Sequence, residues 1–159
     1  MKKPVIVLIA IIYLLAIAVV GFLGIPARVY NPVVFVEDIQ LTFDETLGEE
    51  REITEDEKEL WNADYKFYFT TSEENVYFYV TANVVPTEAT NKKCAFSKLD
   101  TGSFYTMNVG ELSGHYTTAE FNVDTTKFDS SVKMLHFEVK PTDGNKHLSK
   151  VVVIYIRKL

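Results

Sequence analysis

The sequence predicts an all-β sandwich preceded by one membrane-spanning helix. Three observations predict this fold class. The chain begins with a long apolar segment that contains no charged side chain, and the remainder alternates apolar and polar residues with a period of two. Turn residues separate these short alternating runs, as in sandwiches. No convincing crossover helices lie between the runs, so a parallel α/β sheet is not expected.

The composition fits a folded domain of ordinary size plus a small extra element. The chain has 159 residues, of which 47% are apolar and 13% aromatic, so a real core can form and wholesale disorder is not expected. The net charge of −6 gives no support to nucleic-acid binding. Cys94 is the single cysteine, which excludes an internal disulfide.

The apolar segment at residues 5–25 predicts a transmembrane anchor. Its 21 uncharged residues would span roughly 31 Å as a helix, the thickness of a bilayer core. Lys2 and Lys3 precede it, and only Arg28 and then an acidic stretch follow it. The positive-inside rule therefore places the N-terminus in the cytoplasm and residues 28–159 outside. We divide the chain into a cytoplasmic stub and signal-anchor helix (1–27), a short linker (28–33) and a β-sandwich (34–159).

A cleaved signal peptide is the alternative, and it would give a secreted domain. Signal peptides have apolar regions of about 7–15 residues that end in small residues of the A-x-A type. Here the apolar run is longer, and the Gly-Ile-Pro-Ala sequence at 24–27 is a poor cleavage site. We therefore expect an uncleaved anchor.

The strands are predicted in order from the apolar residues that share one face of each run. After the linker, the pattern places strands around 38–43, 65–69, 75–85, 94–96, 119–123, 135–139 and 152–156. Pro86 cannot donate to a β-ladder, so it should end the third run. Residues 87–91 then form a polar connection, and Lys92 and Lys93 should start the next strand.

The acidic segment at residues 44–64 interrupts this pattern. It contains ten acidic residues and only two bases, Arg51 and Lys58. Thr54 and Glu57 have the spacing of a capping box, so a short helix can form, with Trp61 anchoring its end. Because no EF-hand spacing is present, we favour a solvated surface insertion over a calcium site.

The corner between two of the predicted strands resembles a known family. "TANVVPTEATNKKCAFS" is similar to the P-x-x-A-T-N-K-x-V-x-W-S signature of bacterial Ig-like domains of group 2 (BIG2). Cys94 stands where the signature has valine, and "VKPTDGNKHLSKVVVIYI" resembles the last hairpin of the family. The matching residues are Pro86, Ala89, Thr90, Asn91 and Lys92, with Phe96 in place of tryptophan and Asp143 and Gly144 in the last turn.

This resemblance covers roughly residues 33–157 and implies an Ig-like Greek-key β-sandwich of about seven to nine strands. The chain departs from the family in two places. The insertion is longer than usual, and the glycine-rich turn of the middle of the domain is matched only loosely by "GELSGHY". Strand pairing in the middle of the domain is therefore the least determined part of the prediction.

Catalytic, metal and cofactor chemistry is not predicted. His115, His136 and His147 have no neighbours at metal-ligand spacing, and His136 is expected at the surface. Cys94 shares a face with Phe96, which indicates a buried, inert thiol. Hydrolase, P-loop and metalloprotease motifs are absent from the sequence. We therefore expect a protein that is not an enzyme.

Three tyrosines are candidates for an interaction surface. Tyr77 and Tyr79 alternate with Phe78 and Val80, and Tyr68 alternates with its own apolar neighbours. If the apolar faces form the core, these tyrosines point outward, where tyrosine is a common interface residue. The alternative is that the acidic insertion packs over them.

Together these features predict a non-catalytic, membrane-anchored extracytoplasmic Ig-like protein. By analogy with the family it resembles, it binds neighbours or spaces other domains. We expect a structural or interaction subunit of a membrane or cell-envelope assembly, with other protein subunits or further copies of itself as partners. The alternative is a cell-surface adhesion or carbohydrate-binding module.

Overall fold

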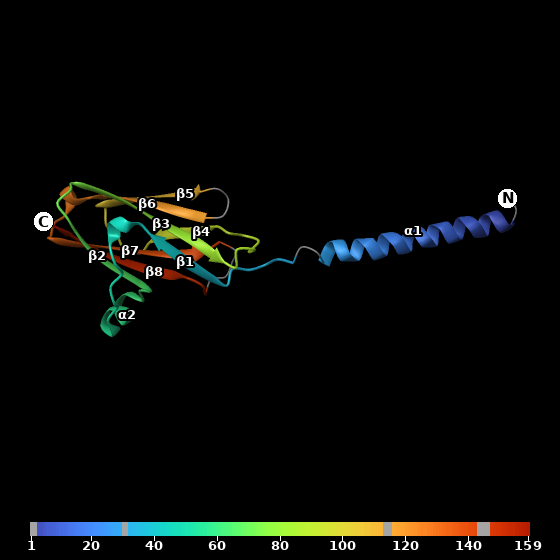
Figure 1. Ribbon diagram of the computed structural model, residues 1–159, viewed down its shortest axis with the longest axis horizontal. Coiled ribbons are helices and arrows are strands. Elements are labelled where there is room, and N and C mark those ends of the chain that lie inside the picture. The colour runs from blue at the N-terminus through green and yellow to red at the C-terminus, as the bar shows by residue number, and fades with distance from the viewer. Residues whose placement is uncertain (1–2, 30–31, 113–115, 143–146) are drawn as a thin grey trace. The chain divides into compact units, whose positions relative to one another are not determined.

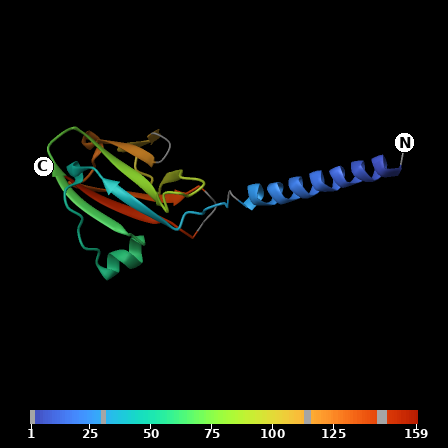
Figure 2. The ribbon, with the colours of Figure 1, turned by 45° about the vertical axis from the view of Figure 1, so that its right-hand side comes forward.

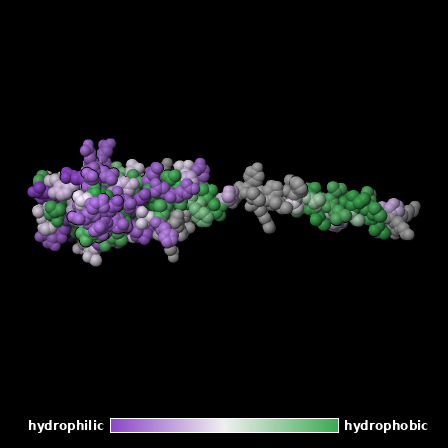
Figure 3. All heavy atoms as spheres, turned by 90° about the horizontal axis from the view of Figure 1, so that it is seen from below, coloured by the Kyte–Doolittle hydropathy of each residue, from purple (hydrophilic) through white to green (hydrophobic). Residues whose placement is uncertain are grey.

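The computed structural model describes residues 3–29, 32–112, 116–142 and 147–159. Its internal contacts divide the chain into residues 1–33 and 34–159. The first unit contains one helix, α1 (Lys3–Val29). Within it, Pro4–Gly21 has a mean hydropathy of 2.9 and carries no charged side chain, so α1 is long and apolar enough to cross a membrane. Figure 3 shows hydrophobic residues along the coloured part of this helix, and a face of the second unit that is largely hydrophilic with hydrophobic residues between.

The second unit is built from two four-stranded sheets (Figure 1). The first sheet has the order β1-β3-β6-β5, and the second has the order β2-β8-β7-β4. The strands are β1 (Asp38–Phe43), β2 (Tyr65–Thr71), β3 (Asn75–Val85), β4 (Cys94–Lys98), β5 (Tyr105–Leu112), β6 (Tyr116–Asp124), β7 (Val132–Pro141) and β8 (Lys150–Lys158). All the predicted runs form strands. β5 is also a strand, but it was not predicted from the sequence.

One pairing differs from an all-antiparallel arrangement. Among the described strands, β2 pairs with β8 in parallel, and the other pairs are antiparallel. The chain leaves the first sheet after β1, passes through the acidic insertion, and enters the second sheet at its edge beside β8. The insertion therefore carries the chain from the first sheet to the second between β1 and β2.

The two sheets share one hydrophobic core, because the apolar residues of each period-two run point toward the other sheet. Phe121 of β6 stacks on Phe78 of β3, with ring centroids 4.9 Å apart and planes 7° from parallel. Across the layers, the rings of Phe121 and Phe137 of β7 are 4.7 Å apart. All three phenylalanines are fully buried. β8 departs from simple alternation, since Val151 and Val153 are buried as well as Val152.

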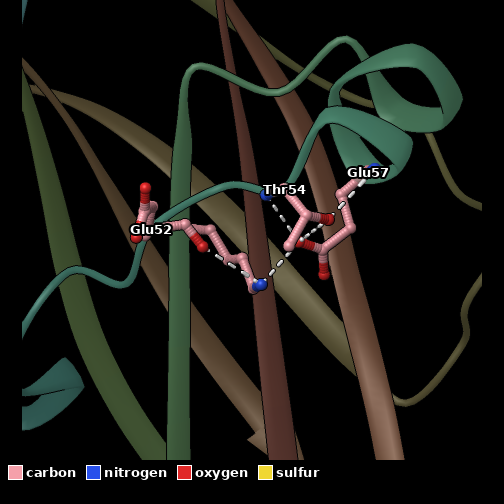
Figure 4. Close-up of polar contacts among 4 residues, drawn as sticks. Glu52, Thr54 and Glu57 are labelled. Atoms are coloured by element: carbon pink, nitrogen blue, oxygen red, sulfur yellow. Dashed lines mark hydrogen bonds and ion pairs between the residues drawn. The ribbon is translucent and has the colours of Figure 1, made fainter.

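The acidic insertion forms a short 3₁₀-helix, η1 (Glu45–Leu47), and a helix, α2 (Glu55–Trp61). The predicted capping box is present: the Thr54 hydroxyl accepts from the Glu57 backbone, and the Glu57 carboxylate accepts from the Thr54 backbone. Figure 4 shows these two side chains beside Glu52. The helix ends at Asn62, whose left-handed φ of 49° is one that asparagine tolerates.

The corner after β3 follows the prediction in part. β3 ends at Val85, directly before Pro86, and the Val85–Pro86 peptide bond is cis. The next strand begins at Cys94, so the expectation that Lys92 and Lys93 start it was wrong by two residues.

Candidate interaction surface

The residues that resemble the BIG2 signature hold the corner of the fold. Thr90 forms two hydrogen bonds with Val34 at the start of the domain: its amide donates to the Val34 carbonyl (2.8 Å), and its Oγ1 accepts from the Val34 amide (2.9 Å). The Asn91 Nδ2 donates to Thr142 Oγ1 (3.0 Å) just after β7. The corner therefore ties together three segments that are distant in the sequence.

The other residues of the signature are apolar or lie at the edge of this corner. Ala89 is 2% exposed, and its amide donates to the Pro86 carbonyl (3.0 Å). Phe96 is buried, and its ring centroid is 6.3 Å from that of Phe137. Lys92 is half-buried. Asp143 and Gly144 lie outside the described residues, as does His115.

The three candidate tyrosines do not form one row. Tyr77 and Tyr79 lie on β3 in the first sheet and are 52% and 47% exposed. Tyr68 lies on β2 in the second sheet and is half-buried. Its ring centroid is 6.5 Å from that of Tyr155 and 5.0 Å from the guanidinium carbon of Arg51. The structure therefore places the tyrosines on the outer faces of two different sheets.

The insertion covers the outer face of the second sheet and leaves the first sheet uncovered. Trp61 of α2 packs edge-on against His136 of β7, with ring centroids 5.4 Å apart. The Lys66 ammonium on β2 lies 2.6 Å from the Glu57 carboxylate of α2. In Figures 1 and 2, α2 accordingly lies on the side of β2 and β8. The expected cover over the tyrosines is thus present at Tyr68 and absent at Tyr77 and Tyr79.

His136 was expected at the surface, and this was wrong. It is half-buried because Trp61 packs over it, and its Nε2 is buried without a hydrogen-bond partner among the described residues. Strand alternation correctly places His136 opposite the Leu135–Phe137 face. Alternation cannot show that an insertion from another part of the chain covers the outer side.

The uncovered outer face of the first sheet is here called the tyrosine face. Its side chains come from all four strands and are hydroxyls, amides and phenols with one carboxylate. The residues that define it are Gln40, Thr42, Tyr77, Tyr79, Thr81, Asn83, Thr106, Asn108, Gly110, Thr118, Glu120 and Asn122.

Cross-strand pairs organise this face into rows. Asn122 of β6 lies between Tyr77 of β3 and Thr106 of β5, and Glu120 lies between Tyr79 and Asn108 in the next row. The Tyr79 hydroxyl donates to the Glu120 carboxylate at 3.2 Å. The negative charge of Glu120 raises the pKa of the Tyr79 phenol, which stays protonated near neutral pH.

Amide oxygens on the tyrosine face have unused hydrogen-bonding capacity. The Asn83 Nδ2 donates to Thr42 Oγ1 (3.3 Å), but the Asn83 Oδ1 is buried and has no partner among the described residues. The Asn122 Oδ1 is also buried and has no hydrogen-bond partner among the described residues. Buried polar atoms usually have partners, so these two oxygens are exceptions within the described part of the chain.

A shallow pocket of about 130 Å³ adjoins the tyrosine face at the row of Tyr77 and Asn122. Its lining is mainly polar and comes from β3, β5, β6, the loop before β5 and the 3₁₀-helix η2 (Thr125–Lys127). The lining residues are Asn75, Ser103, Phe104, Tyr105, Thr106, Asn122, Asp124 and Lys127.

Asp100 fixes the wall of this pocket. Its carboxylate accepts three hydrogen bonds at 2.8 Å, from the Gly102 amide, the Tyr105 hydroxyl and the His136 amide. Burial and this carboxylate raise the pKa of Tyr105 strongly. A side chain at Gly102 would meet the Phe104 ring at 2.4 Å, so the turn requires glycine. Asp100 was not predicted as a site residue, although the Asp-Thr-Gly sequence at 100–102 is a turn signal.

Other site chemistry is limited in the described part of the chain. Within it, no group of three or more His, Cys, Asp or Glu side chains is arranged to hold a metal ion. Cys94 is buried.

Comparisons of the chain with protein families, curated proteins and solved structures found no match.

Proposed function

We propose that the chain is a non-catalytic, membrane-anchored binding protein that acts outside the cytoplasm. In this proposal α1 is a single-pass anchor, with the N-terminus in the cytoplasm and the β domain on the other side. The length and hydropathy of α1 support the anchor, and the lysines that precede it support the orientation. N-terminal sequencing of the mature protein tests the anchor: retention of Met1 or Lys2 is expected, and a start near residue 28 would show cleavage.

We further propose that the β domain is an Ig-like Greek-key sandwich of the BIG2 type. The order β1-β3-β6-β5 corresponds to strands A-B-E-D of an immunoglobulin domain, and β8-β7-β4 corresponds to G-F-C. β2 is then an added edge strand, which follows the acidic insertion. The BIG2 assignment rests on the corner residues Pro86 to Lys92 and on Phe96.

The observation that carries the binding role is the difference between the two outer faces. α2 covers the outer face of the second sheet, whereas Tyr77 and Tyr79 on the first sheet are about half exposed. Exposed tyrosines are enriched at interfaces because the ring supplies contact area and the hydroxyl a hydrogen bond. We propose that the tyrosine face binds a partner within a membrane or cell-envelope assembly.

Capture from native membranes tests this proposal. The tagged full-length protein is solubilised in mild detergent, and proteins that co-purify at a fixed ratio are identified by mass spectrometry. The variant Tyr77→Ala/Tyr79→Ala should lose these partners. The control Leu60→Ala removes a 69% exposed apolar side chain on α2 and should keep them. Retention of every partner by the tyrosine variant would contradict the proposal.

A second candidate function, a carbohydrate-binding module, is favoured by the polar pocket beside Tyr77. The two candidates share the tyrosine face and differ in the chemistry of the partner.

A further inference from the structure

We infer that the tyrosine face and its pocket bind an uncharged carbohydrate, with Tyr77 and Tyr79 as the platform and the polar side chains of the pocket, Asn122 among them, as its hydrogen-bond partners. This inference rests on the proposed binding role of the tyrosine face and names the class of its ligand.

The two rings provide the apolar part of the site. Tyr77 and Tyr79 are two residues apart on one strand, so they emerge on the same face about 6.7 Å apart. The face of an aromatic ring carries partial negative charge. The C–H groups on one side of a sugar ring carry partial positive charge and make weak favourable contacts with such a surface. Neighbouring tyrosines therefore suit neighbouring sugar units.

The amides and hydroxyls provide the polar part. Asn122 is the cross-strand neighbour of Tyr77, lines the pocket, and has a buried Oδ1 without a partner among the described residues. An amide side chain in the lining can donate to or accept from a sugar hydroxyl. Asn75, Ser103 and Thr106 line the same pocket and can donate or accept further hydrogen bonds.

The pocket is too small and too polar for a typical cofactor. Pockets for such ligands usually have about 300–1,000 Å³ and mostly apolar walls. The pocket beside Tyr77 has about 130 Å³, is open to solvent, and has amide, hydroxyl and carboxylate side chains in its lining. These properties suit one hydroxyl-rich unit of a chain that continues over the exposed rings.

The charges on the described residues argue against other ligand classes. The charged residues of this side of the sheet are acidic: Glu120 lies on the tyrosine face, and Asp38 and Asp124 lie at the ends of its strands. In the pocket Lys127 pairs with Asp124 at 3.0 Å. A nucleic acid, a phospholipid headgroup or an acidic polysaccharide requires cations that the tyrosine face lacks.

Calorimetric titration of the full-length protein tests the inference. The detergent should have a polyoxyethylene headgroup, because a sugar headgroup would compete for the site. The probes are the neutral tetrasaccharides cellotetraose, mannotetraose and tetra-N-acetylchitotetraose, with tetragalacturonate as the anionic comparison. We expect at least one neutral probe to bind with a Kd below about 1 mM, and tetragalacturonate to bind at least about tenfold more weakly.

Variants identify the contacts. Tyr77→Ala and Asn122→Ala should each weaken binding of that probe by about tenfold or more, whereas Tyr77→Phe should keep it within about threefold because the ring remains. The control Leu60→Ala changes an exposed side chain on α2, outside the tyrosine face, and should bind like the wild type. The fluorescence of Trp61, which lies on α2 and packs against the second sheet, verifies that each variant is folded.

Two results would overturn the inference. One is that no neutral probe binds at 5 mM, about five times the expected upper Kd. The other is that Tyr77→Ala and Asn122→Ala bind as the wild type does. If either occurs while Tyr77→Ala/Tyr79→Ala still loses its protein partners, the carbohydrate inference fails and the proposed binding role stands. If protein capture is also unaffected by that variant, both fail.

Discussion

Replacing Asp100 by alanine should destabilise the β domain and open the wall of the pocket. The Asp100 carboxylate accepts hydrogen bonds from Gly102, Tyr105 and His136, all at 2.8 Å. Tyr105 is 3% exposed, so its hydroxyl cannot readily turn to water when the carboxylate is removed. The His136 amide lies inside β7 and loses the same acceptor.

The magnitude follows from the donors that are left unpaired. A buried donor without a partner costs about 1–3 kcal/mol. The Gly102 amide is on a turn that water can reach, so we count only the Tyr105 hydroxyl and the His136 amide, and expect a loss of about 3 kcal/mol. The β domain spans residues 34–159, and a domain of this size has a total stability of about 6–19 kcal/mol. Asp100→Ala should therefore still fold.

Urea unfolding of the full-length protein in detergent, followed by Trp61 fluorescence, measures this loss. With an m value of about 2 kcal/mol per molar urea, the midpoint should fall by about 1.5 M. The control Asp129→Ala removes a carboxylate that is 78% exposed and pairs with Lys133, and its midpoint should stay close to that of the wild type. Equal midpoints for Asp100→Ala and Asp129→Ala would refute the reasoning.

Three further predictions concern α2 and the core. Thr54→Ala removes the N-cap and should destabilise α2 by about 1 kcal/mol, seen as faster amide hydrogen exchange in α2 with the core strands unchanged. The ammonium of Lys66 and the hydrogen bonds of Thr54 lower the pKa of Glu57 from 4.5 to about 2. Because the folded-state pKa is the lower one, this stabilisation is complete above about pH 4.5 and is lost as the pH falls toward about 2. Trp61 fluorescence should change over this pH range in the wild type but not in Glu57→Gln. Identical fluorescence–pH curves for the two proteins would contradict this prediction. Phe121→Ala should cost about 3–5 kcal/mol in urea unfolding, because its ring contacts both sheets; a loss below about 1 kcal/mol would contradict the packing described here.

The sequence predicts the strands well where alternation is strong. β3 was predicted residue for residue, because Val76, Phe78 and Val80 alternate without a break and Pro86 ends the run. The capping box of α2 was predicted for a similar reason, since Thr54 and Glu57 act within one turn. Local rules of this kind depend only on residues that are close in the chain.

The missed features depend on contacts between distant segments. β5 is an edge strand with Val109 48% exposed, so its apolar pattern is weak. Strand alternation shows that Tyr68 and Tyr77 point outward, but it does not show which sheet each strand joins. Three features can be seen only in the tertiary structure: the parallel pairing of β2 with β8, the packing of α2 over His136, and the hydrogen bonds that Asp100 accepts.

Photocrosslinking from the tyrosine face tests the central claim most directly. A photoreactive phenylalanine analogue replaces Tyr77 in one variant and Tyr68 in another, and both are irradiated in native membranes. The binding role predicts a defined crosslinked product from position 77 and little or none from position 68, which α2 and Arg51 partly cover. Products from position 68 alone, or none from position 77, would contradict the assignment of the tyrosine face as the binding surface.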